Sequence, residues 1–153
     1  MFRRSGEGLE VLLAHPGGPF FAKKDAGAWT NPKGEAAPDE DLLTRARIEF
    51  EEEVGIAATS DCWIELGSIK QKGGKTVHAW AFESDLPAGF VVISNEFEIE
   101  WPPRSGRRAS FPEVDQACFF DEPTAREKIK STQLPLIDRL REHLASVEAT
   151  REA

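Results

Sequence analysis

Three glutamates in the middle of the chain have the residue type and the spacing of a metal site. Glu49, Glu52 and Glu53 stand at positions i, i+3 and i+4, which a helix places on one face within about 100° of one another. Like charges at this spacing repel, and each pair destabilises a helix by about 0.2–0.5 kcal/mol. A hard divalent cation such as Mg²⁺ offsets that repulsion, because it prefers carboxylate oxygens and keeps waters that bridge to a phosphate. The alternative is an ordinary solvated acidic face.

The turn before this acidic segment carries groups suited to a phosphate and a cation. Pro32, Lys33 and Gly34 form a short turn. The lysine ammonium is a point charge for phosphate oxygens. Glycine has no side chain, so its backbone can approach a ligand closely and offer a carbonyl oxygen.

A helix over residues 39–54 is predicted to position the three glutamates. Asp39 is the expected N-cap, acids follow it in the first turn, and Gly55 is the expected stop. At about 100° per residue, the apolar side chains form a stripe that faces a core. These are Leu42, Leu43, Ala46, Phe50 and Val54.

The rest of the sequence predicts interleaved strands and helices, hence an α/β or α+β layered fold. Helices are expected at 123–130 and 134–147, and a basic loop at 102–108. The expected strands are 9–14, 28–31, 64–69, 76–83, 97–101 and 117–120, with residues 2–4 as the stub of an earlier one.

Composition narrows the class of protein. The 153 residues predict one domain spanning 1–153, and a net charge of −8 argues against bulk binding of nucleic acid. No apolar run approaches the ~20 residues needed to cross a bilayer. Two cysteines are too few for a disulfide framework. We therefore expect a cytoplasmic protein without membrane contacts, as a monomer or homodimer.

Residues 34–56 resemble the Nudix box, whose pattern is Gly-x5-Glu-x7-Arg-Glu-U-x-Glu-Glu-x-Gly-U, where U is bulky and aliphatic. Phe50 fills the first U position only loosely. The turn Trp29–Glu35 also resembles the entry to this box in Nudix enzymes of the dinucleoside-polyphosphate and diphosphoinositol kind. The positions in register are Gly34, Glu40, Glu49, Glu52, Glu53, Gly55 and Ile56.

Two features depart from the family pattern. Ile48 stands where the box has an arginine that orients the catalytic glutamates. Arg45 lies four residues before Glu49, so it could pair with that carboxylate along the helix. In addition, the first strand of the family is longer than the short stub at residues 2–4.

The resemblance implies a Nudix-type α/β/α sandwich with a mixed central sheet and a truncated first strand. It implies hydrolysis of a nucleoside diphosphate linked to a group X, with Mg²⁺ or Mn²⁺ as cofactor. Glu49 and Glu53 would be the principal metal ligands, and Glu52 a ligand or the general base. The Gly34 carbonyl would be a further ligand. A distal acid often adds one more, for which we favour Glu98 over Glu100 and Glu113.

Candidate contacts to a nucleotide substrate follow from the same resemblance. Lys33, Lys72 and Arg107 would hold phosphates, and Trp29 would stack on a base, although a tryptophan beside a strand end is often part of the core. The leading substrates are nucleoside triphosphates and dinucleoside polyphosphates. Diphosphoinositol polyphosphates or nucleotide sugars follow. A non-catalytic module that binds a nucleotide or a protein is the alternative, and an unrelated acidic interaction domain is a third.

Overall fold

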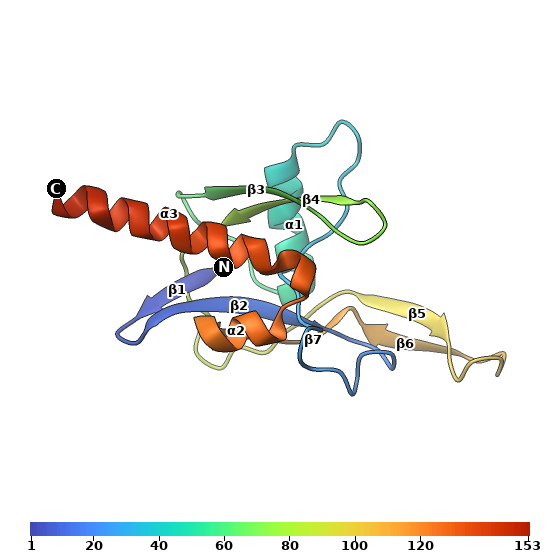
Figure 1. The fold of residues 1–153 in the computed structure, drawn as a ribbon. Coiled ribbons are helices and arrows are strands. Elements are labelled where there is room, and N and C mark those ends of the chain that lie inside the picture. Colours follow the sequence, from blue (N-terminus) through green and yellow to red (C-terminus); the bar gives the residue numbers. More distant parts are fainter.

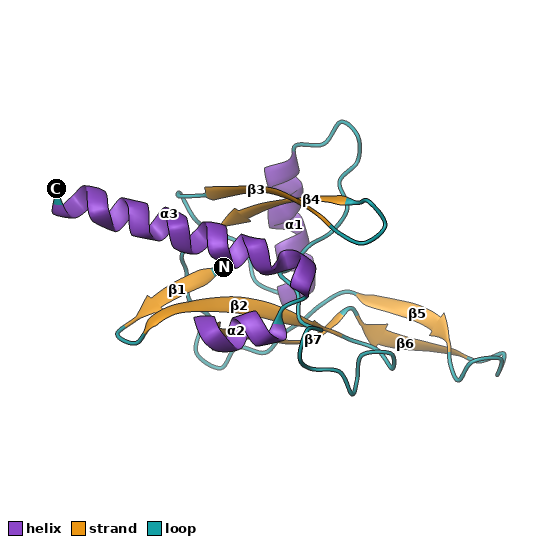
Figure 2. Cartoon of the chain, in the orientation of Figure 1, coloured by secondary structure: helices purple, strands orange, loops and turns teal.

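A computed structural model describes residues 1–153 as three α-helices and seven strands with long connecting loops (Figures 1 and 2). None of the helices is both long and apolar enough to cross a bilayer. The elements in chain order are β1 (Phe2–Ser5), β2 (Gly8–Pro16), α1 (Leu42–Val54), β3 (Ile64–Lys70), β4 (Thr76–Ala81), β5 (Glu96–Glu100), β6 (Arg108–Pro112), β7 (Val114–Asp121), α2 (Glu122–Lys128) and α3 (Leu134–Glu152).

The centre of the fold is an antiparallel sheet in the order β1-β2-β7, covered on both faces. Leu12 of β2 packs with Phe50 and Val54 of α1, whereas the neighbouring Leu13 packs with Ala125 of α2 and Ile137 of α3. Successive side chains of a strand point to opposite faces. The continuous apolar run in β2 is therefore explained by helices on both sides, and the predicted layered α/β fold is confirmed.

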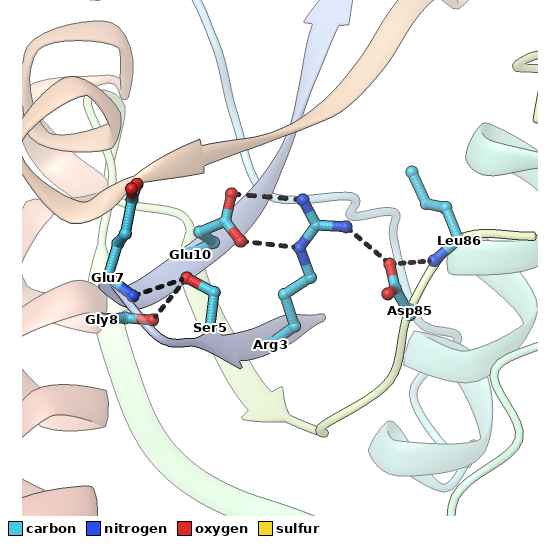
Figure 3. A network of polar contacts seen from close by, with 7 residues as sticks. All are labelled: Arg3, Ser5, Glu7, Gly8, Glu10, Asp85 and Leu86. Atoms are coloured by element: carbon cyan, nitrogen blue, oxygen red, sulfur yellow. Dashed lines mark hydrogen bonds and ion pairs between the residues drawn. The ribbon is translucent and has the colours of Figure 1, made fainter.

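Strand β1 is short and connects the central sheet to the segment after β4. Phe2 N–H donates to Phe82 O at 3.0 Å, and Ser84 N–H donates to Phe2 O at 3.0 Å. This bridge is parallel, which gives the otherwise antiparallel arrangement its mixed character. The Arg3 guanidinium lies 2.8 Å from the Glu10 carboxylate and 2.7 Å from the Asp85 carboxylate (Figure 3). It therefore also connects the central sheet to the segment after β4.

A strand that the sequence did not predict forms part of a projecting hairpin. The predicted basic loop ends at residue 108 and no element was predicted for 109–112, but residues 108–112 pair with β5 as β6, with Phe97 opposite Phe111 and Glu98 opposite Ser110. Cross-strand partners make this a strand where its own basic and polar residues do not predict one. The β5–β6 hairpin extends away from the helices (Figure 1).

Helix α1 begins later than predicted and ends where predicted. Its N-cap is Asp41, whose carboxylate accepts from Thr44 N–H at 2.9 Å, so the prediction of Asp39 was wrong. Asp39 lies in the preceding turn, because the adjacent Glu40 carboxylate bends back to accept from Ala37 N–H at 3.1 Å. Gly55 ends the helix at φ 90°, a left-handed conformation that glycine adopts at little cost.

Candidate functional site

Helix α1 presents its acidic residues beside the turn that precedes it. Phe50 and Val54 are buried against the sheet, which leaves the neighbouring Glu49, Glu52 and Glu53 at the edge of the contact, all half-buried. Lys33 N–H donates to Glu53 Oε2 at 3.0 Å. The predicted helix face and the predicted turn therefore lie side by side, with residues 33 and 53 in direct contact.

Gly34 lies directly against the Glu49 carboxylate. A Cβ added at Gly34 would stand 1.7 Å from Glu49 Cδ and 2.1 Å from each carboxylate oxygen. Such distances are far inside van der Waals contact, so a side chain added at Gly34 would have to displace the Glu49 carboxylate. The immediate neighbour of Gly34 in this structure is therefore the carboxylate of Glu49.

Arg45 holds Glu49 and the turn before the helix at the same time. Its guanidinium lies 2.8 Å from Glu40 Oε1 and 3.4 Å from Glu49 Oε1. The ion pair predicted between Arg45 and Glu49 is confirmed. Ile48, at the position where an arginine was expected, is 38% exposed and lies on the outer face of α1. The arginine that contacts Glu49 is therefore Arg45, one helical turn before it.

Burial and like charge act together on the glutamates of α1. Desolvation by burial raises the pKa of Glu53 to about 7. The hydrogen bond from Lys33 N–H and the charge of the Lys33 ammonium act in the opposite direction and lower it. Desolvation likewise raises the pKa of Glu49, and the charge of Glu52 adds to that effect. Carboxylates kept in such surroundings favour a counter-cation.

A fourth acid adds negative charge to the same region, and it is not the one we favoured. The charge of Glu113, between β6 and β7, raises the pKa of both Glu49 and Glu53. Glu98 instead pairs with Arg108 on the exposed β5–β6 hairpin. The reason is the register of that hairpin, which places Glu98 among its own cross-strand partners. The charge of Glu113, and not that of Glu98, therefore acts on the helix carboxylates.

The backbone places Glu113 beside the C-terminal half of α1. Asn95 N–H donates to Glu52 O at 3.0 Å, Glu113 N–H donates to Asn95 O at 2.8 Å, and Gly17 N–H donates to Glu113 O at 2.9 Å. This relay joins residues far apart in the sequence. An acid next to Pro112 between two strands is a weak signal, and sequence spacing alone does not select it.

The donor set has the chemistry that a hard cation requires. Glu49, Glu52, Glu53 and Glu113 would supply carboxylate oxygens, and the backbone of Gly34, which lies against Glu49, could supply a carbonyl. Lys33 is a cation at their edge. Because Glu49 turns to Arg45 and Glu53 to Lys33 N–H, the acids do not converge as a group of three on one point. The residues fit Mg²⁺ or Mn²⁺ in type, and binding requires their carboxylates to turn.

Removing the charge at Glu53 is expected to change how stability depends on pH. Between about pH 4.5 and 7 the folded chain holds a proton at Glu53 that the unfolded chain has lost. The contribution of this group to the free energy of unfolding therefore falls as pH rises through that window and is constant above it. Glu53→Gln should be more stable than the parent at pH 8, on the order of 2 kcal/mol, and nearly equal at pH 4.5.

Urea unfolding in EDTA at the two pH values measures this difference. Glu51→Gln removes the same charge from an exposed position two residues earlier and serves as the control. A stability gain for Glu53→Gln that is the same at both pH values would contradict the burial of this carboxylate.

Of the predicted substrate contacts, Lys33 lies beside the glutamates. Lys33 contacts Glu53, as described above. Lys75 pairs with Glu35, which places the β3–β4 turn beside the Gly34 segment, and Lys72 is an exposed residue of that same turn. Arg107 lies instead at the tip of the β5–β6 hairpin.

Trp29 does not have the exposure that stacking on a base requires, and this prediction was wrong. The side chain is 4% exposed. Its Nε1–H donates to Asp25 Oδ1 at 2.7 Å, and its ring makes edge contacts with His15 at 5.1 Å and Phe120 at 4.9 Å. Residues 28–30 are buried between β2 and α2, because Thr30 bridges to Ala14 and Trp29 to Ile129.

Comparison with known proteins gives matches in structure only. No protein-family model matches the sequence, and no curated protein is similar to it. Among solved structures, an Ap4A hydrolase from C. elegans in a binary complex has a TM-score of 0.64 at 19% identity, over 95% of this chain and 94% of that one.

Two further structures cover nearly the whole chain. The NUDIX domain of Shewanella oneidensis NrtR, in complex with ADP ribose, has a TM-score of 0.58 at 17% identity over 94% of this chain and 82% of that one. The E. coli ORF135 protein has a TM-score of 0.57 at 20% identity over 94% and 86%. At such identities the likeness is one of fold. The central sheet between α1 and the α2–α3 pair is the fold of the NUDIX domain.

Proposed function

We propose that the chain is a Mg²⁺- or Mn²⁺-dependent hydrolase of phosphoanhydride bonds in compounds of a nucleoside diphosphate linked to a group X. The observation that carries the proposal is the half-buried carboxylate pair of Glu49 and Glu53, one against Gly34 and the other bonded to Lys33 N–H. Carboxylates with raised pKa values beside a lysine suit a site that handles a cation and a polyanion together. The NUDIX fold of the chain supports this assignment.

Each residue of the site has a defined task in this proposal. Glu49 and Glu53 would hold the metal ion, with Glu52 as a further ligand or the base and the Gly34 carbonyl as a backbone ligand. When bound, the ion would neutralise the pyrophosphate and lower the pKa of a water. A glutamate would take a proton from the attacking water as the water oxygen bonds to phosphorus, and the anhydride P–O bond would break to release a phosphate or nucleotide.

Positive side chains would hold the departing and remaining phosphates. Lys33 lies beside Glu53 and fits the phosphate next to the bond that breaks. Lys72, on the turn brought close by the Lys75–Glu35 pair, fits a more distant phosphate. Glu113 adds carboxylate charge that a second ion can use. We do not assign a metal role to Glu98, because Arg108 already neutralises it.

A panel of substrates in Mg²⁺ tests the function. It contains the nucleoside triphosphates, Ap4A, ADP ribose, a nucleotide sugar and a diphosphoinositol polyphosphate, with products separated by anion-exchange chromatography. We expect turnover of at least one member, which EDTA abolishes and Mn²⁺ restores. Binding of a nucleotide without any turnover would favour the non-catalytic module, and neither binding nor turnover would reject the proposal.

Arg45 is predicted to support turnover by holding Glu49 and Glu40 in place. Arg45→Met should lower kcat about 10-fold or more, because a misplaced ligand loses the preorganised charge at the reacting phosphorus. Arg47→Met is the matched control, since Arg47 leaves the same helix on the exposed side and lies 5.6 Å from the Trp63 ring. Steady-state kinetics of both variants measure the difference, and an equal loss in both would contradict the role of Arg45.

A further inference from the structure

An aromatic pair of one exposed and one half-buried ring takes no part in the mechanism above. Phe20 is 60% exposed, and its ring meets that of Trp101 edge-to-face at 5.7 Å. Phe20 belongs to the loop after β2, and Trp101 follows β5. With Trp29 buried in the core, this pair offers the most exposed aromatic ring of the chain to a planar ligand.

The pair is anchored close to the acidic residues. Gly17 N–H donates to Glu113 O at 2.9 Å, and Gly18 packs on the Phe97 ring of β5, 2.7 Å from where its Cβ would stand. Three residues of extended chain span at most about 11 Å. The backbone of Phe20 is therefore within about 11 Å of the backbone of Gly17, which contacts the distal acid directly.

The hairpin tip beside Trp101 carries arginines without partners. The tip is ordered by its own bonds, from Trp101 N–H to Arg107 O at 2.9 Å and from Gly106 N–H to Glu100 Oε1 at 2.8 Å. Arg104 and Arg107 are exposed, and neither guanidinium makes a hydrogen bond or ion pair. In a chain of net charge −8, two free guanidinium groups next to an exposed ring are a local exception.

We propose that Phe20, Trp101 and the two arginines of the tip bind a nucleoside monophosphate unit, which is the end of the substrate that carries its base. The base stacks on the exposed ring, because every base has a π-face that an aromatic side chain can cover. The guanidinium groups hold the adjacent phosphate. This inference rests on the proposed function and names the part of the substrate that the glutamates do not contact.

Binding of AMP in EDTA tests the surface without any contribution from metal or turnover. Fluorescence titration should give a Kd that rises about 10-fold in Phe20→Ala and in the double variant Arg104→Ala/Arg107→Ala. Val91→Ala, which shortens a 73% exposed side chain on another loop, should leave the Kd unchanged. Adenosine should lose affinity only in Phe20→Ala, and inorganic phosphate only in the arginine variant.

Steady-state kinetics with the panel member that is hydrolysed fastest provide a second test of this surface. A base held equally in the ground and transition states raises KM and leaves kcat unchanged when its contact is lost. We expect that pattern for Phe20→Ala, with about a 10-fold rise in KM. If AMP does not bind, or binds Phe20→Ala as tightly as Val91→Ala, the surface is not a nucleotide site. If AMP binds as expected but no substrate is hydrolysed, the proposed function fails and this inference stands.

Discussion

Glu53→Gln is expected to lower kcat by about 10²–10⁴-fold while the chain stays folded. The amide oxygen of glutamine can still accept from Lys33 N–H, which now bonds Glu53 Oε2 at 3.0 Å, so the turn keeps its place. The substitution removes the charge that holds a cation, and with it the stabilisation of negative charge at the transferred phosphoryl group. Turnover and thermal unfolding of the same preparation measure the two effects.

The matched control is Glu51→Gln, which changes the same charge at an exposed position of α1 and should leave kcat within about twofold of the parent. Comparable losses in both variants would show that the net charge of the helix, and not the contact with Lys33, supports turnover. Loss of turnover that accompanies unfolding of Glu53→Gln would likewise count against the assignment.

Gly34→Ala should abolish most of the activity with little loss of stability. The new Cβ would stand 1.7 Å from Glu49 Cδ, so one of the two must move. The carboxylate is the end of a flexible side chain that is not fully buried, and its displacement is less costly than a backbone shift. We expect kcat to fall at least about 100-fold, since small misplacements at a reacting centre cost that much.

Gly6→Ala provides the comparison for this variant. Gly6 has open space where a Cβ would be added and no left-handed backbone, so the substitution should change neither kcat nor the melting temperature. A Gly34→Ala protein with the activity of Gly6→Ala would mean that Glu49 works equally well away from the turn, and its proposed role as a principal ligand would be withdrawn.

The local part of the site could be predicted because it depends on helix periodicity. The i, i+3, i+4 spacing places Glu49, Glu52 and Glu53 together, and the i, i+4 spacing gives the Arg45–Glu49 pair. The stop at Gly55 follows from the same local chemistry. The start of α1 was misplaced by two residues at Asp39, because several acids compete for the cap and only one reaches a free N–H.

The non-local part could not be predicted from one sequence. Trp29 is buried by contacts with His15 and Phe120, and nothing in its own neighbourhood in the sequence shows them. The choice between Glu98 and Glu113 depends on the register of β5 with β6. That register fixes which acid faces the hairpin and which faces α1, and it is set by pairing across the sheet.

The surface position of Ile48 has an evolutionary consequence. Because the Ile48 side chain is 38% exposed, an arginine could replace it without repacking the interior. The guanidinium that pairs with Glu49 in this chain belongs to Arg45. The same helix can carry an arginine at position 45 and an arginine at position 48. An arginine could therefore be added at position 48 while the Arg45–Glu49 pair is kept.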